Sequence, residues 1–291
     1  MEHIKTIGII GLGNMGLGMA LSLQRAGFQV LGLDKNDQTA GRAEEKGIPL
    51  ARDMAELVDA SDSIVLSLPN SAIVREVLVG VAGIARLANR KLTVIDTTTA
   101  DPEATRELAK QLGNQGLVLL DAPVSGGPGG ALRGELTMFV GGETEDVQAA
   151  MPVLSGMGKN LFHIGGTGAG NIAKIVNNLL TAAQLLTAAE AFRMAEAAGV
   201  KTEQLLDAVN AGSGRSGVTL FNYPNRILSG TFDSGFTMQL MRKDVALAAA
   251  LHEKLGVEVP VSKVVADVWR DSASAMADEE DFNRIVNFTR A

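Results

Sequence analysis

A glycine-rich segment between two apolar runs constrains the fold of this chain more than any other feature. The run IKTIGII at 4–10 is short, apolar and β-branched, which is typical of a buried parallel strand. Apolar residues then recur at helical spacing over 14–26, and Gly27 suits the residue that follows a helix. The run FQVLGL at 28–33 is typical of a second strand. The segment therefore predicts a strand, a glycine turn, a helix and a strand, in that order.

The predicted turn matches the pattern G-x-G-x-x-G at Gly11, Gly13 and Gly16. The first glycine permits a tight turn, the second lets a pyrophosphate approach the backbone, and the third lets the helix pack on the strand. The N–H groups at the helix start then face the phosphates. Asp34 ends the second strand, where its carboxylate can accept hydrogen bonds from ribose hydroxyls. Since Asp34 also repels a 2′-phosphate, the segment predicts a dinucleotide site that prefers NAD to NADP, with Lys35 offsetting part of that repulsion.

Strands and helices continue to alternate as far as residue 164, which predicts an α/β Rossmann domain with a doubly wound parallel sheet. Three polar or glycine-containing segments follow apolar strands directly, at 68–70, 97–99 and 125–127. Each alone can be an ordinary surface loop. Because ligands bind at the carboxyl ends of parallel strands, we expect the three segments to line one cleft.

After residue 164 the character of the sequence changes. Residues 168–198 are rich in alanine and leucine, contain no proline, and are followed by Gly199, which predicts a long and largely buried helix. The remainder is predicted to be helical, with breaks near 210–217, Pro224, Gly230 and Pro260. We expect an NAD-binding domain over 1–164, and a helical substrate and dimerisation domain over 165–291. Its apolar helices suggest a homodimer or a homotetramer.

Composition excludes several classes of protein. The formal net charge of −7 argues against nucleic-acid and anionic-membrane partners, which select basic surfaces. The absence of cysteine excludes disulfides, thiolate nucleophiles and cysteine-ligated zinc. No run approaches the ~18 uncharged apolar residues of a membrane span, and MEHIKTIGII leaves no room for a signal peptide. We therefore expect a cytoplasmic protein. His3, His163 and His252 lack metal-ligand spacing, so no metal site is expected.

Two polar residues stand out on the predicted long helix. Lys174 and Asn178 lie four positions apart and so share one face. They can be a lysine at the wetter edge of the helix and a surface amide. Lys174 is flanked, however, by Ile172, Ala173, Ile175 and Val176. A buried lysine can act as a general acid or base near neutral pH.

Four motifs together resemble the β-hydroxyacid dehydrogenase family: GLGNMG at 11–16, DAPVSGG at 121–127, GAGNIAKIVNN at 168–178 and LMRKD at 240–244. This family includes 3-hydroxyisobutyrate dehydrogenase and tartronate semialdehyde (2-hydroxy-3-oxopropionate) reductase, and the resemblance covers essentially the whole chain. It implies a Rossmann domain followed by a helical domain. It also implies that a 3-hydroxy carboxylate is oxidised by NAD(P), or that the reverse reaction occurs.

The resemblance implies roles for individual residues. Lys174 corresponds to the catalytic lysine and Asn178 to an amide that helps to hold the substrate. Ser125, Gly126 and Gly127 correspond to the loop that binds the substrate carboxylate. The implied cofactor contacts are Gly11, Leu12, Gly13, Asn14, Met15, Gly16, Asp34, Leu68, Pro69, Thr98, Thr99 and Lys243.

The substrate itself is left open. SGRSGVTLFNYPNRI at 213–227 departs from the form associated with mammalian-type 3-hydroxyisobutyrate enzymes, with Gly217 where a bulky residue is expected. Arg215 can pair with a second anionic group of the substrate or remain a solvated loop residue. The alternatives are a reductase of another semialdehyde or of an imine, and a non-catalytic NAD-binding protein of the same fold. The presence of Lys174 favours alcohol chemistry over imine reduction, and Lys174 with Asn178 and the Ser125 loop disfavours a non-catalytic protein.

Overall fold

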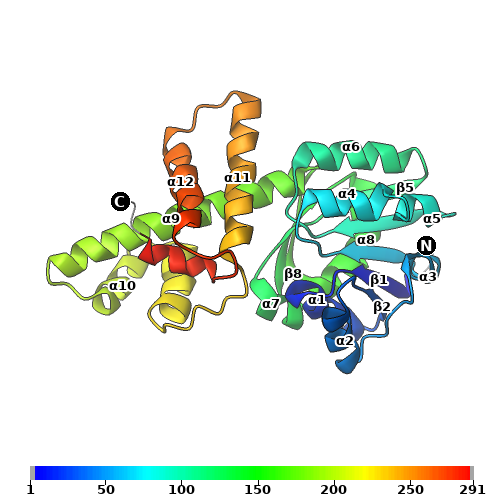
Figure 1. Ribbon diagram of the computed structural model, residues 1–291, viewed down its shortest axis with the longest axis horizontal. Coiled ribbons are helices and arrows are strands. Elements are labelled where there is room, and N and C mark those ends of the chain that lie inside the picture. The colour runs from blue at the N-terminus through cyan, green and yellow to red at the C-terminus, as the bar shows by residue number, and fades with distance from the viewer. Residues whose placement is uncertain (1–3, 289–291) are drawn as a thin grey trace. The chain divides into compact units, whose positions relative to one another are not determined.

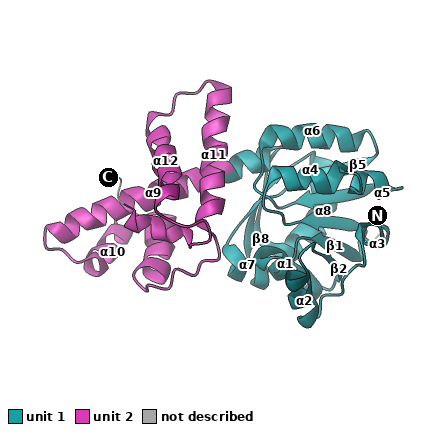
Figure 2. Ribbon diagram, in the orientation of Figure 1, with its two compact units in different colours: residues 1–174 teal, residues 175–291 magenta. Residues whose placement is uncertain are grey.

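The computed structural model describes residues 4–288 and divides into two compact units (Figure 2). Unit 1 comprises residues 1–174 and unit 2 comprises residues 175–291. The division falls inside one helix, α9 (Ala169–Ala197), whose ends lie within one residue of the helix expected from the sequence.

Unit 1 contains a sheet with the strand order β2-β1-β3-β4-β5-β7-β6, and β8 pairs with β7 outside this path. The strands are β1 (Thr6–Ile10), β2 (Gln29–Leu33), β3 (Ser63–Leu66), β4 (Leu92–Asp96), β5 (Leu117–Asp121), β6 (Val124–Ser125), β7 (Leu136–Gly141) and β8 (Gly158–Gly165). Strands β2, β1, β3, β4 and β5 run parallel to one another, as expected. Strands β7 and β8 run parallel to each other. The expectation of a wholly parallel sheet is corrected at β7, which runs antiparallel to β5 and β6.

The direction of β7 follows from its short connection. Only α7 (Gly127–Arg133) lies between β6 and β7. A crossover between parallel strands needs about a dozen residues or more. The shorter segment therefore returns the chain in the opposite direction, so that β7 pairs antiparallel with β6.

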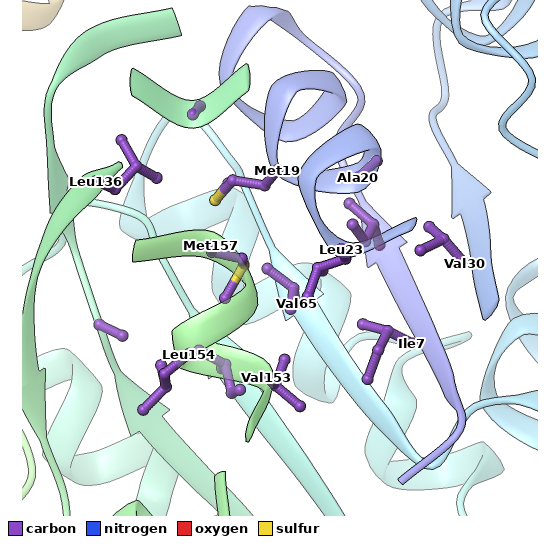
Figure 3. Packing of buried hydrophobic residues seen from close by; sticks show 14 of the residues in the cluster. Ile7, Met19, Ala20, Leu23, Val30, Val65, Leu136, Val153, Leu154 and Met157 are labelled. Atoms are coloured by element: carbon purple, nitrogen blue, oxygen red, sulfur yellow. The ribbon is translucent and has the colours of Figure 1, made fainter. Parts of the chain in front are cut away.

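Helices cover both faces of this sheet (Figure 1), and a separate apolar core lies between the sheet and the helices on each face. The remaining helices of unit 1 are α1 (Asn14–Arg25), α2 (Asp37–Glu45), α3 (Met54–Ala60), α4 (Ser71–Val79), α5 (Ile84–Leu87), α6 (Pro102–Gly113) and α8 (Thr144–Met157). On one face, Met19 and Leu23 of α1 pack with Leu154 and Met157 of α8 (Figure 3). On the other face, α3, α4, α5 and α6 contribute to the second core. The doubly wound Rossmann architecture is therefore confirmed.

Unit 2 is helical and has its own core around the fully buried Trp269. Its elements after α9 are α10 (Thr202–Ala211), a π-helix (Val218–Ile227), α11 (Met238–Leu255), α12 (Pro260–Asp271) and two short 3₁₀ helices (Ser272–Ser274 and Phe282–Asn287). Pro224 was expected to break a helix, but it lies inside the π-helix. The wider turn of a π-helix accommodates the ring and the missing N–H group of proline.

By length and composition alone, α9 is long and apolar enough to cross a membrane. No such segment was expected from the sequence. Its first turns carry the buried polar side chains of Asn171, Lys174 and Asn178. Farther along, Leu185 and Phe192 belong to the core of unit 2. The expectation of a largely buried helix is corrected, because 33% of the apolar 18-residue window of α9 is buried and Leu180 and Met194 are exposed.

Candidate active site

The glycine turn follows β1 at the carboxyl edge of the sheet, where the strand order reverses between β1 and β3. Gly11 has a φ of +90°, and a Cβ atom there would lie 2.3 Å from the carbonyl oxygen of Ser67. A Cβ at Gly16 would lie 1.8 Å from the carbonyl oxygen of Gly11. At Gly13, a Cβ would meet no atom of the described chain within 4 Å. Two of the glycines therefore maintain the turn, and the third faces open space.

The start of α1 suits an anionic ligand. Among the described residues, no side chain caps this helix, whose N-cap residue is Gly13. Uncapped N–H groups at a helix start form a ready site for phosphate. The side chain of Asp34 lies at the same turn, because its Oδ2 accepts a hydrogen bond from the backbone N–H of Leu12 at 2.7 Å. The exposed Asn14 accepts a hydrogen bond from Arg42 at 3.2 Å. The turn, the free helix end and the acid fit a dinucleotide.

Beside this turn, hydrogen bonds join the loops that follow β3 and β4. The backbone N–H of Leu68 donates to Oγ1 of Thr98 at 3.2 Å. The hydroxyl of Thr97 donates to the carbonyl oxygen of Leu66 at 2.6 Å. Thr99 and the exposed Pro69 lie on the same two loops. The predicted contacts at 68–69 and 98–99 therefore lie at adjacent strand ends, as their spacing in the sequence suggested.

The segment DAPVSGG connects β5 to α7. Ser125 is the last residue of β6, where it pairs with Thr137 of β7, and it is partly buried. Gly126 and Gly127 follow with φ values of +130° and +63°, so the chain turns sharply before α7 begins. Helix α7 packs against α1, where a Cβ at Gly18 would come within 2.9 Å of the Cβ of Ala131. The helix that follows the Ser125 loop is thereby packed against the helix of the glycine turn.

Lys174 is 7% exposed, in the second turn of α9, and belongs to unit 1. Asn178 lies one helical turn farther on and is 4% exposed. The alternative of a lysine at the wetter edge of the helix and a surface amide is therefore excluded, because both side chains are buried. Burial removes the water that would otherwise compensate their polar groups, so each requires partners or a ligand.

In unit 2, Asn178 belongs to a polar cluster that includes a residue which sequence reasoning missed. Its Nδ2 donates to Oδ2 of Asp244 at 2.5 Å, and its Oδ1 accepts from Asn177 at 3.0 Å. Lys243 forms an ion pair with Asp244 at 2.9 Å. Asp244 is 1% exposed, on the face of α11 that also buries Met241. An acidic residue on the apolar stripe of a predicted helix was the available signal for it.

No group of three or more histidine, aspartate or glutamate side chains within residues 4–288 is arranged to hold a metal ion. The ring Nε2 of His163 contacts the carbonyl oxygens of Gly142 and Gly165, at 2.8 and 3.1 Å. His3 lies outside the described residues.

Comparison with known families gives two adjoining matches. Residues 6–165 match the NAD binding domain of 6-phosphogluconate dehydrogenase. Residues 168–289 match the family described as the NAD-binding domain of NADP-dependent 3-hydroxyisobutyrate dehydrogenase. The two matches meet at the start of α9, three residues before its buried Asn171.

Full-length relatives agree with these matches. The chain is 33% identical over 286 residues to 2-(hydroxymethyl)glutarate dehydrogenase of Eubacterium barkeri, covering 98% of this chain and 95% of that protein. It is 33% identical to the mitochondrial 3-hydroxyisobutyrate dehydrogenase of Mus musculus, covering 100% of this chain and 88% of that protein. The solved structure of Mycobacterium tuberculosis 3-hydroxyisobutyrate dehydrogenase with L-serine superposes with a TM-score of 0.90 at 32% identity, covering 99% of this chain and 100% of that one.

Likeness over the whole length, in sequence and in fold, establishes the family that the sequence motifs indicated. The chain belongs to the 3-hydroxyisobutyrate dehydrogenase family of β-hydroxyacid dehydrogenases, NAD(P)-dependent oxidoreductases that act on CH–OH groups.

Proposed function

We propose that this chain interconverts a short 3-hydroxy carboxylic acid and its semialdehyde or 3-oxo acid, with NAD as the preferred cofactor and Lys174 as the acid–base group. The observation that carries the proposal is the buried Lys174, in the same unit as the glycine turn and the Ser125 loop. The nicotinamide ring, when bound, accepts or returns the hydride. The protein must then supply a proton carrier, an anchor for the carboxylate and a dry environment.

Lys174 is proposed to take the hydroxyl proton when the alcohol is oxidised, and to return it when the carbonyl is reduced. Asn178 is proposed to hold the same oxygen through its Nδ2, one helical turn farther on. Asp244 accepts one N–H of this amide and Asn177 donates to its Oδ1, which fixes its orientation and leaves the second N–H of Nδ2 for the substrate. Lys243, paired with Asp244, is proposed to contact the cofactor.

The Ser125 loop is proposed to bind the substrate carboxylate. The donors available there are the hydroxyl of Ser125 at the end of β6 and the backbone N–H groups of Gly126 and Gly127, which carry no side chains. Pro128, which follows, has no N–H. Charge-assisted hydrogen bonds to a carboxylate are short and strong. An acid would therefore be held with its reacting carbon at a fixed distance from the loop.

The substitution Ser125→Ala is expected to lower kcat/KM by about 10- to 150-fold. This corresponds to the ~1.5–3 kcal/mol of a hydrogen bond to a charged group. The measurement is a steady-state assay of both enzymes with the best acid substrate. The matched control is the primary amide of the same acid, for which the loss at Ser125 should be much smaller. An amide that the wild type turns over as well as the acid contradicts this role for the loop.

Asp34 is proposed to set the preference for NAD. Its two carboxylate oxygens accept backbone N–H groups from Leu12 and Asn36, at 2.7 and 2.9 Å, and their remaining lone pairs are available to ribose hydroxyls. A phosphate on the 2′-oxygen would meet this negative charge. The exposed Lys35 follows Asp34 directly and the exposed Arg42 donates to Asn14 of the turn, so both are proposed to moderate the repulsion.

The substitution Asp34→Asn is expected to narrow the ratio of kcat/KM for NAD over NADP by about fivefold or more. Two unit charges 4 Å apart repel by ~1 kcal/mol even in water. Asparagine keeps one oxygen for the N–H of Leu12, so this contact with the turn is retained, while the charge and the acceptor for the N–H of Asn36 are lost. Kinetics with both cofactors on both enzymes provide the measurement. A wild type with the higher kcat/KM for NADP would show that Asp34 does not act in this way.

A spectrophotometric assay of NADH with a panel of short hydroxy acids and semialdehydes tests the proposed function. The panel includes 3-hydroxyisobutyrate and 2-(hydroxymethyl)glutarate, after the names of the relatives, and tartronate semialdehyde. Activity on a dicarboxylate would favour Arg215, which is exposed in unit 2, as the partner of a second carboxylate. Turnover of imines but of no alcohol would favour the reductase alternative. NADH binding without any turnover would favour the non-catalytic one.

We further propose that the enzyme acts in the cytoplasm as a homodimer or homotetramer. Unit 2 presents apolar side chains to its surface, among them Phe221 and Val261, which are 57% and 74% exposed. Exposed apolar surface of this kind is typical of the subunit interfaces of homo-oligomers. Sedimentation of the purified chain measures the oligomeric state directly.

A further inference from the structure

A buried polar network holds the first turn of α9 against the sheet of unit 1. The carboxylate of Asp121, at the end of β5, accepts two backbone N–H groups of this turn. Its Oδ1 accepts from Gly168 at 2.7 Å, and its Oδ2 accepts from Asn171 at 2.9 Å. Asp121 and Asn171 are both 0% exposed. The carboxylate therefore caps the helix from outside, through a strand that is distant in sequence.

The side chain of Asn171 extends the network to two further segments. Its Oδ1 accepts from the backbone N–H of Ala100 at 2.9 Å, in the loop after β4. Its Nδ2 donates to Oγ1 of Thr105 at 3.1 Å, in α6. Both contacts are buried, so their loss would leave polar atoms without water. One amide thereby joins α9 to the loop after β4 and to the helix that follows it.

The backbone also approaches closely at this point. A Cβ at Gly170 would lie 2.2 Å from the carbonyl oxygen of Phe139 and 2.6 Å from that of Asp121. The helix thus begins in direct contact with the ends of β5 and β7, with no side chain between them. Burial raises the pKa of the Asp121 carboxyl, and the N–H groups that it accepts oppose this rise.

The network connects two parts of the proposed site. Asp121 opens the segment 121–127, which carries Ser125 four residues later. Asn171 lies three residues before Lys174, less than one turn of the same helix. The atoms that join these two segments are therefore within a few residues of both functional groups, and all of them belong to unit 1.

We propose that Asp121 and Asn171 are positioning residues that fix Lys174 relative to the Ser125 loop. The proposal rests on the proposed function of Lys174. In this proposal the network sets the geometry of the reaction and does not itself contact the substrate. Errors of about 1 Å in the placement of a reacting group can cost ~100-fold in rate.

The test is a double-mutant cycle on kcat with Asn171→Ala and Lys174→Ala. In the wild-type background, Asn171→Ala is expected to lower kcat by about 10- to 100-fold, while the Kd for NADH changes little. In the Lys174→Ala background, where no lysine remains to be positioned, the same substitution should change the residual rate by no more than about twofold. Independent sites would instead give the same factor in both backgrounds. Single-turnover hydride transfer at high enzyme concentration measures the slow variants.

Ser63→Ala is the matched control. Ser63 is 1% exposed, and its hydroxyl donates to the carbonyl oxygen of Thr93 at 2.9 Å, where β3 and β4 begin. This substitution also deletes a buried hydrogen bond, at the opposite edge of the sheet, and should lower Tm without changing kcat. If Asn171→Ala does not fold, Thr105→Val removes the acceptor of Nδ2, together with the hydrogen bond that the same hydroxyl donates to the carbonyl oxygen of Asp101 at 3.0 Å. It should also lower kcat, by a smaller factor than Asn171→Ala.

The outcomes separate the two proposals. If Lys174→Ala retains more than about a tenth of kcat, the role of Lys174 itself is wrong, and the positioning role falls with it. The positioning role alone is wrong in two cases, both with a Lys174→Ala enzyme that has lost its activity. In the first, Asn171→Ala lowers kcat by the same factor in the wild-type and Lys174→Ala backgrounds. In the second, Asn171→Ala leaves kcat of the folded enzyme unchanged.

Discussion

Replacing Lys174 by alanine is expected to lower kcat by about 10²- to 10⁴-fold, the contribution of a positioned general acid or base. The fold should persist, because alanine is a better helix former than lysine and the rest of α9 is unchanged. NADH affinity should also persist, since the glycine turn and Asp34 lie on other elements. The measurement is kcat on the best substrate, with fluorescence titration of NADH.

Two further variants make this result specific. Lys174→Arg should not restore activity, because a guanidinium keeps its proton at neutral pH. Lys110→Ala removes an exposed lysine from the last turn of α6 and should leave kcat unchanged. A Lys174→Ala enzyme that binds NADH and keeps more than about a tenth of wild-type kcat would exclude the acid–base role.

The glycine turn provides the second large effect, through a matched pair of substitutions. Gly16→Ala places a methyl group 1.8 Å from the carbonyl oxygen of Gly11, so the turn must shift. We expect NADH to bind about 100-fold more weakly, equivalent to ~2.7 kcal/mol, and the protein to lose the ~1–3 kcal/mol typical of overpacking. Isothermal titration and thermal unfolding measure the two quantities.

Gly13→Ala is the counterpart, because its methyl group meets no atom of residues 4–288 within 4 Å. Its backbone φ of −57° is available to any residue. Here we expect an unchanged Tm and NADH binding weakened by about tenfold or more, since the methyl group would occupy space left for the pyrophosphate. Unchanged NADH affinity in Gly13→Ala would contradict the placement of the phosphates at this turn.

Short-range sequence patterns predicted those elements whose conformation is set by neighbouring residues in the chain. The glycine turn, the strands beside it and the length of α9 follow from hydrophobic periodicity and from residues that permit or end a helix. The direction of β7 was not foreseen, because strands look alike in sequence whichever way they run. The short connection through α7, which decides the direction, is recognised only once its bounds are known.

The networks around the candidate site could not be predicted for a different reason. Asp244 is 66 residues from Asn178, and Asp121 is 50 residues from Asn171. No spacing rule joins residues so far apart, because only the packing of α9 on other elements brings them together. What the sequence did offer was the unusual presence of polar residues on apolar stretches, at Lys174, Asn178 and Asp244.

The position of the boundary between the units has a consequence for synthesis of the protein. Every strand of the sheet, and every partner of Asp121 and Asn171 named above, precedes Ile175 in the chain. Domains fold as units during translation, and the first to emerge folds first. The ribosome needs roughly 10 s to add a segment as long as unit 2. Lys174 and the Ser125 loop can therefore be ordered on the nascent chain before Lys243 and Asp244 have been translated.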